Sequence, residues 1–127
     1  MKILLDTCDF LYLISGDSKL SSRALSAILD PLNSVFLSAV SCWEISVKHG
    51  LGKLVLPEPP SEFVTKQREL HQIESLSLDE LSVEQLSGLP AIHRDPFDRM
   101  LTCQTLAHGL TLASSDPLIH QYPVTIL

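Results

Sequence analysis

The chain has 127 residues, of which 45% are hydrophobic and 19% are charged, and its formal net charge is −6. This length suits one folded domain with its own core, and the composition excludes a disordered chain. A negative net charge disfavours a broad nucleic-acid-binding surface, so a site for an anionic substrate would have to be local.

The N-terminal residues and the cysteines indicate where the protein is found. No apolar run is long enough to cross a bilayer, and Asp6 interrupts the apolar core that a signal peptide would need. The three cysteines, Cys8, Cys42 and Cys103, are widely spaced and fit neither a disulfide framework nor a zinc site. We therefore expect a cytoplasmic protein without membrane association.

Strand-like and helical segments alternate along the chain. Short apolar runs predict strands at MKILLD, SVFLS, IESL, LTLASS and VTIL. Helical periodicity and terminating Gly or Pro residues predict helices that begin at FLYLI and that cover about 18–31, 39–52, 61–70, 77–90 and 96–108. Such alternation predicts right-handed crossovers and a parallel sheet covered by helices on both faces. The expected fold is a three-layer α/β domain, with residues 1–127 forming a single domain.

Four acidic residues fall where strands end or where helices begin: Asp6, Glu44, Asp98 and Asp116. The carboxyl ends of parallel strands share one edge of the sheet, where ligands bind beside a topological switch point. Clustered carboxylates repel one another unless a cation lies between them, and their oxygens suit Mg²⁺ or Mn²⁺. The pattern therefore favours a divalent-metal site.

The acids of the later segments also have purely structural explanations. Asp95 followed by Pro96 is an ordinary helix start, and Asp98 then lies where a negative charge suits the helix dipole. Asp116 precedes Pro117 and is able to cap a short helix.

The two earlier acids differ in how well a structural role accounts for them. Ser41 and Glu44 have the spacing of a capping box, whereas a helix capped by Ser38 would leave Glu44 free for a ligand. A structural role explains Asp6 least well, because a charge at the end of a buried strand needs a partner.

Four segments, taken in order, resemble a known family: ILLDT, LSAVSCWEISVKHGLGKL, HRDPFDRML and GLTLASSDP. They resemble a PIN domain and, more narrowly, the VapC-type toxin ribonucleases of type II toxin–antitoxin pairs. The resemblance extends over nearly the whole chain. It implies a parallel sheet of about five strands and the metal-dependent hydrolysis of RNA phosphodiesters.

The resemblance also implies roles for individual residues. The catalytic and metal-binding quartet that it implies consists of Asp6, Glu44, Asp98 and Asp116, with Mg²⁺ or Mn²⁺ as the cofactor. Thr7 matches the hydroxyl residue after the first acid, and Asp95 is an extra acid that caps the helix and positions Asp98. The chain departs from the pattern at Cys8 and Asp9, where many relatives carry histidine after LDT. This departure lies outside the quartet and bears on substrate preference.

Basic and aromatic residues near these segments are weaker candidates. Candidate contacts to RNA phosphates are Lys48, Arg94 and Arg99. Lys48 lies four residues after Glu44, so a helix ion pair explains it at least as well. We expect His49 and His93 to be surface or internally satisfied histidines, and Trp43 to be a core or interface residue.

The resemblance further implies a cognate protein antitoxin over the active-site face, together with a homodimer or a toxin–antitoxin hetero-oligomer. A catalytically silent PIN-like binding module is the alternative, and the presence of all four acids favours the enzyme. An aspartyl-phosphate phosphatase is disfavoured because two residues, not one, separate Asp6 from Asp9. A receiver domain is disfavoured because no lysine follows Lys66.

Overall fold

The computed structural model describes residues 1–127 and contains a five-stranded parallel sheet with the strand order β3-β2-β1-β4-β5. The strands are β1 (Lys2–Leu5), β2 (Ser34–Ser38), β3 (Glu74–Leu76), β4 (Thr111–Ala113) and β5 (Thr125–Ile126). In the central strand β1, Leu5 lies beside Leu37 of β2 on one side and Ala113 of β4 on the other. The expected α/β fold with a parallel sheet of about five strands is confirmed.

Six α-helices connect and flank these strands. They are α1 (Thr7–Ser15), α2 (Ser22–Leu29), α3 (Ala39–Gly50), α4 (Pro60–Leu70), α5 (Glu80–Glu84) and α6 (Pro96–His108). The helix predicted over 77–90 is shorter than expected, because α5 passes into a 3₁₀ turn at Gln85–Gly88. The predicted strand LTLASS ends early, at Ala113. The backbone turns there, and the Asp116 amide donates a hydrogen bond to the Ser114 hydroxyl (3.1 Å).

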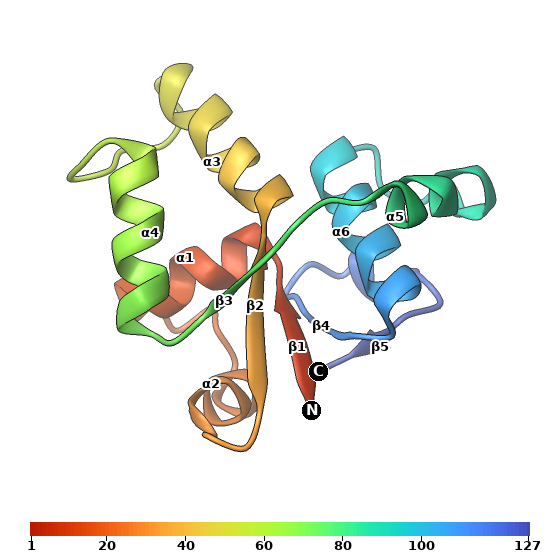
Figure 1. Ribbon diagram of the computed structural model, residues 1–127, viewed down its shortest axis with the longest axis horizontal. Helices are drawn as coiled ribbons and strands as arrows, with labels where there is room; N and C mark the ends of the chain where they lie inside the picture. The colour runs from red at the N-terminus through yellow and green to blue at the C-terminus, as the bar shows by residue number, and fades with distance from the viewer.

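Successive residues of β1 point to opposite faces of the sheet, as the pleat of a strand requires. Ile3 and Leu5 pack with residues of α1, α2 and α4, whereas Leu4 packs with Leu101 of α6. Helices therefore cover the sheet on both faces, with α1, α2 and α4 on one side and α6 on the other (Figure 1). No helix combines the length and the apolar composition that crossing a membrane requires.

A buried polar contact fixes α3 relative to α6 above the sheet. Ser38 ends β2 and is also the N-cap of α3, where its hydroxyl accepts a hydrogen bond from the Val40 amide (3.0 Å). The same hydroxyl donates to the side chain of Gln104, a fully buried residue of α6 (2.6 Å). Gln104 in turn donates to the Ser77 carbonyl (3.2 Å). The beginning of α3 is thereby held against α6, beside the carboxyl ends of β1 and β4.

Candidate active site

The strand order reverses at the centre of the sheet, between β1 and β4. The chain passes from β1 to β2 on one side, and β4 later returns to the other side of β1. Such a switch point leaves a crevice at the carboxyl ends of the two strands. Asp6 follows β1 and Asp116 follows β4, and the Asp6 amide donates to the Ala113 carbonyl (2.9 Å). The topology therefore brings these two acids to the same part of the sheet edge.

Asp6 is a buried carboxylate with only neutral hydrogen-bond donors around it. Its side chain is the N-cap of α1, where it accepts from the Asp9 amide (2.6 Å), and it also bonds to the Ser114 hydroxyl. Asp6 is 3% exposed. The pKa of Asp6 is raised to about 7, mainly by burial and to a smaller extent by repulsion from Asp9. A positive charge beside Asp6 would therefore favour its ionised form.

Glu44 points into the protein from α3 and is held by residues of two helices. The capping-box explanation of Glu44 is wrong, because Ser38 and not Ser41 caps α3. Glu44 is 2% exposed, and its Oε1 accepts from the Thr7 hydroxyl (2.6 Å). The Thr7 hydroxyl also lies 2.9 Å from Ser41 Oγ, and Lys48 donates to the other carboxylate oxygen, Oε2. Thr7, the residue after Asp6, therefore fixes the orientation of the Glu44 carboxylate.

Asp95 and Asp98 have different positions in the first turn of α6. Asp95 is the N-cap, as predicted, and its Oδ1 accepts from the Phe97 amide (2.8 Å). Asp98 faces the other acids, and burial, followed by repulsion from Asp95 and Glu44, raises its pKa to about 6. The charge of Asp98 also raises the pKa of Asp6, so the acids of α1, α3 and α6 form one electrostatic cluster.

The two carboxylate oxygens of Asp116 have separate partners. Oδ1 accepts from the Leu118 amide (2.9 Å) and so holds a local turn, but no side chain caps the 3₁₀ helix Ile119–Gln121 that follows. Oδ2 lies 2.8 Å from Nε2 of His93, and the same nitrogen lies 3.2 Å from Oδ2 of Asp98. Ligand atoms of His93, Asp98 and Asp116 all lie within 4.8 Å of one another. One side chain therefore holds the local turn and also contributes to the acidic cluster.

His93 and Asp9 are site residues that the sequence analysis missed. His93 is an internally satisfied histidine, as expected, but its partners include two acids of the cluster, and the sequence analysis did not predict this contact. Asp9 is 1% exposed and accepts from the Ser115 hydroxyl (2.8 Å), which ties α1 to the loop that carries Asp116. For His93, the signal in the sequence was its position two residues before the helix cap. For Asp9, the signal was a second charge one turn after Asp6.

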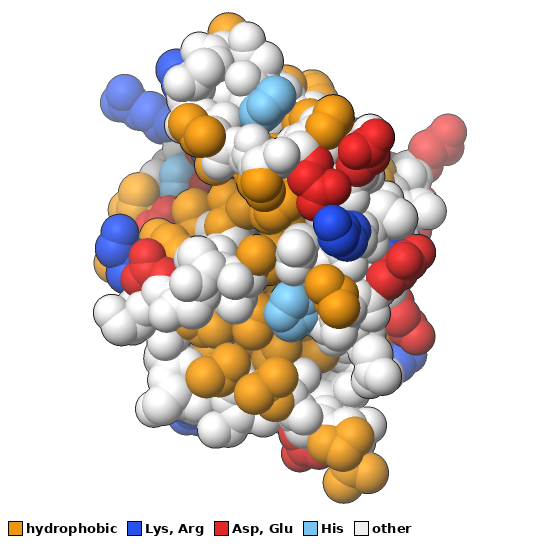
Figure 2. All heavy atoms as spheres, turned by 90° about the vertical axis from the view of Figure 1, so that its left-hand side faces the viewer, with side chains coloured by type: hydrophobic (Ala, Val, Ile, Leu, Met, Phe, Trp, Pro, Cys, Tyr) orange, Lys and Arg blue, Asp and Glu red, His pale blue; other side chains and the backbone are white.

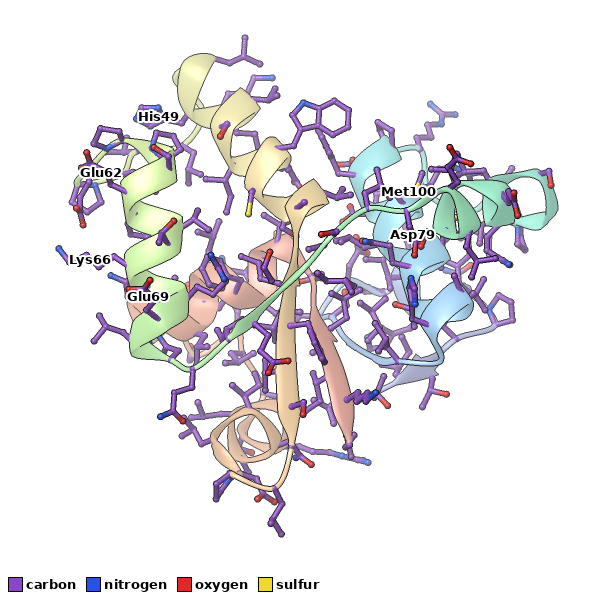
Figure 3. All side chains as sticks on the ribbon, viewed as in Figure 1. His49, Glu62, Lys66, Glu69, Asp79 and Met100 are labelled. Carbon is purple, nitrogen blue, oxygen red and sulfur yellow. The ribbon has the colours of Figure 1, made fainter.

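The basic and aromatic candidates near the site differ in whether they have partners within the protein. Lys48 is paired with Glu44, and Arg99 donates to the Pro90 carbonyl (3.0 Å), whereas the Arg94 side chain is exposed. His49 lies on the α4 side of α3 (Figure 3), because five residues along a helix place it about 140° around the axis from Glu44. Of the two expectations for Trp43, the core position is wrong, since the side chain is 59% exposed and contacts Phe97 edge to face with ring centroids 4.8 Å apart. The interface position stays a prediction.

The donor set fits a hard divalent cation. The cluster supplies carboxylate oxygens from four separate segments of the chain, and hard cations such as Mg²⁺ and Mn²⁺ prefer oxygen ligands. Two of these carboxylates have pKa values raised by burial and by their acidic neighbours, so a cation among them would relieve the repulsion. Cys8 is a poor ligand, because desolvation and the acids Asp6 and Glu44 raise the pKa of its thiol to about 11.

Comparison with known sequences identifies relatives. Ribonuclease VapC16 of Mycobacterium tuberculosis is 36% identical to this chain over 66 residues. The match covers 52% of this chain and 45% of the relative, so the chain spans about half the length of this curated protein.

Comparison with solved structures shows the same fold over nearly the whole chain. VapBC2 from Rickettsia felis, bound to a DNA fragment from their promoter, has a TM-score of 0.72 at 16% identity, with 100% of this chain and 97% of that chain covered. FitAcB from Neisseria gonorrhoeae has a TM-score of 0.64 at 20% identity, with 98% and 96% covered. VapBC-1 from nontypeable Haemophilus influenzae has a TM-score of 0.63 at 18% identity, with 95% and 91% covered.

A model of the PIN domain family matches residues 3–124, which is nearly the whole chain. The match includes every acid of the cluster, all of β4 and all of β1 except Lys2. The chain therefore belongs to the PIN domain family.

Proposed function

We propose that the protein is a Mg²⁺- or Mn²⁺-dependent endoribonuclease, the toxin of a type II toxin–antitoxin pair, acting in the cytoplasm. One observation carries the proposal: acids from four segments converge at the carboxyl edge of the sheet, and two of them, Asp6 and Asp98, have pKa values raised to about 7 and about 6. Such a cluster is costly without a cation, and a cation-binding cluster of carboxylates suits phosphodiester hydrolysis.

Membership of the PIN domain family and the similarity to a protein named as a ribonuclease support this activity. Because the match covers less than half of that relative, RNA as the substrate is part of the proposal. The alternative is a PIN-like module that binds its partner without catalysis, and the retention of all four acids favours the enzyme.

The acids divide into those that hold the cation and those that orient groups around it. We assign Asp6, Asp98 and Asp116 as the main ligands, with Glu44 completing the set directly or through water. A bound Mg²⁺ or Mn²⁺ supplies an acidified water and neutralises charge on the phosphate. Thr7 and Lys48 hold the Glu44 carboxylate in a single orientation, and Asp95 begins the helix that presents Asp98.

Few basic side chains are free to bind RNA near the site. Arg94 is exposed, while Lys48 and Arg99 have partners within the protein and would have to exchange them for phosphates. On the face that carries α4, Lys and Arg are scattered and interspersed with Asp and Glu (Figure 2). Since electrostatic RNA binding needs clustered positive charge, we expect weak general binding and selection of a particular RNA at the site itself.

A protein antitoxin is the expected partner. Similar folds have been solved as VapBC and FitAB complexes, two of them with DNA fragments. We propose that this chain also binds a cognate antitoxin over the active-site face, as a homodimer or within a toxin–antitoxin hetero-oligomer.

The test is cleavage of RNA by purified protein, free of antitoxin, with Mg²⁺, Mn²⁺ or EDTA. The variants are Asp6→Asn and Asp98→Asn, which keep the shape of the side chain and remove its charge. Asp30→Asn is the matched control, because it makes the same change at the exposed end of α2, and the amide oxygen can still accept from the Leu32 amide.

We expect wild type and Asp30→Asn to cleave RNA with either metal and not with EDTA. Each site variant should lose at least about 100-fold in rate, because one ligand or charge-stabilising group is removed. Equal cleavage by all four proteins would identify a contaminating nuclease. Metal binding without cleavage of any RNA would favour the silent binding module.

A further inference from the structure

The His93 side chain is held at both ring nitrogens, and its backbone is held as well. Nδ1 accepts a hydrogen bond from the Asp95 amide (3.0 Å), and the His93 amide donates to the Tyr122 hydroxyl (2.7 Å). Nε2 lies 2.8 Å from Asp116 and 3.2 Å from Asp98. Its side chain is only 14% exposed, so the ring has little freedom to turn away.

These partners determine which ring nitrogen carries the proton. A backbone N–H can only donate, so Nδ1 of His93 must present its lone pair to the Asp95 amide. The hydrogen of the ring therefore lies on Nε2, where it faces two carboxylate oxygens, both of which are acceptors. Every polar group around the ring is satisfied in this tautomer and in no other.

This tautomer bears on how the site holds a cation. His93, Asp98 and Asp116 have the spacing of a histidine–carboxylate metal site. A metal on Nε2 would need the lone pair there, and the displaced proton on Nδ1 would then point at the Asp95 N–H. The hydrogen bonding of the ring therefore argues against His93 as a ligand, although its distance from the acids would allow it.

We propose that His93 is a positioning residue whose Nε2–H bridges Asp98 and Asp116 and holds the two carboxylates at the spacing that a divalent cation needs. This inference rests on the proposed metal-dependent function. This donation leaves Oδ1 of Asp98 for the cation, together with the lone pair of Asp116 Oδ1 that the Leu118 amide does not use. Groups that orient metal ligands in this way commonly change metal affinity by 10–100-fold.

The first test concerns the metal-free protein, labelled with ¹⁵N at histidine. Long-range ¹H–¹⁵N correlation spectra distinguish a protonated ring nitrogen from one with a lone pair. We expect His93 to be protonated at Nε2 and not at Nδ1. A ring protonated at Nδ1 alone would overturn the inference, whether or not the protein is a nuclease.

The second test uses Mn²⁺ as the probe and two variants. His93→Gln can place an amide N–H near the position of Nε2, whereas His93→Phe keeps a ring and lacks the donor. The electron paramagnetic resonance signal of free Mn²⁺ measures the binding affinity. We expect the affinity to fall by about 10–100-fold in His93→Phe and to be mostly restored in His93→Gln. Unchanged Mn²⁺ affinity in His93→Phe, or an equal loss of affinity in both variants, would overturn the proposed bridging role of His93.

The third test asks which atoms coordinate Mn²⁺ when it is bound to the wild-type protein. Electron spin echo modulation detects a directly coordinated imidazole nitrogen, and we expect none. A coordinated nitrogen would make His93 a ligand and overturn the inference even if a variant failed to fold. If wild type binds no Mn²⁺, the proposed function fails, while the tautomer measurement still decides whether His93 bridges the two acids.

Discussion

At the scale of single residues, burial and mutual repulsion make the ionised acids of the cluster costly for stability. Asp6 and Asp98 are held where burial and neighbouring acids raise the pKa of each, and the hydrogen bonds to Asp6 offset this only in part. Such sites are common where a protein must hold a charged ligand or change a protonation state. We expect their cost to be greatest when no cation is bound.

The metal-free protein should lose stability as the pH rises. The folded-state pKa values of about 7 for Asp6 and about 6 for Asp98 exceed the ordinary aspartate pKa of about 4, so the folded state binds more protons than the unfolded state between about pH 4 and pH 7. The free energy of unfolding therefore falls with pH across this window.

Replacing either acid by asparagine should reduce this fall. We expect Asp98→Asn to be more stable than wild type by about 3 kcal/mol near pH 8, and Asp6→Asn by about 4 kcal/mol, with little difference near pH 4. Asparagine at position 6 can still cap α1. Urea unfolding in EDTA at both pH values measures the effect, and a parallel pH dependence in wild type and variants would contradict it.

At the scale of the helix, the beginning of α6 shows how local signals place a candidate metal ligand. Asp95 caps the helix, Pro96 occupies its first position, and Gly109 ends it in the left-handed conformation at φ 61°. These signals are local in sequence, and the predicted range 96–108 agrees with the observed helix. The register of α6 then directs Asp98 toward the cluster.

Two substitutions at Asp95 should separate the contribution of its helix cap to stability from the contribution of its charge. Asp95→Asn keeps an oxygen for the Phe97 amide and removes a charge that raises the pKa of Asp98, so we expect stability close to or above that of wild type. Asp95→Ala removes both, and should be about 1 kcal/mol less stable than Asp95→Asn. Thermal and urea unfolding near pH 8 measure the difference, and equal stability of the two variants would show that the cap contributes little.

At the scale of the whole molecule, the sheet order brings distant parts of the chain together. Thr7 and Glu44 are 37 positions apart, His93 and Asp116 are 23 apart, and Asp9 and Ser115 are 106 apart. Each contact crosses the carboxyl edge of the sheet between α1, α3, α6 and the loop after β4. A cation bound there would contact several segments of the fold and should stabilise all of it.

Mn²⁺ should therefore raise the melting temperature of the wild-type protein. Binding to the folded state alone adds about 2.7 kcal/mol at a roughly 100-fold excess over Kd, which is on the order of 10 °C for a chain of this size. Asp98→Asn should show a much smaller rise, whereas Asp30→Asn should respond like wild type. Scanning calorimetry with and without EDTA measures these shifts, and equal shifts in all three proteins would mean that the ion binds elsewhere.

The sequence by itself determined the features that depend on neighbours along the chain. Periodicity and capping residues were sufficient to predict the alternating strands and helices, the bounds of α6 and the capping role of Asp95. The spacing of the acids relative to the strands, together with the family resemblance, was sufficient to select Asp6, Glu44, Asp98 and Asp116 as one group.

The tertiary structure alone decided the features that depend on contacts across the fold. It selected Ser38 over Ser41 as the cap of α3, buried Asp9 against Ser115, and brought His93 between Asp98 and Asp116. A local pattern cannot specify these features, because each depends on which segments the strand order brings together. The partners of His93 come from α6 and from the loop after β4, and only the folded chain places both beside one imidazole ring.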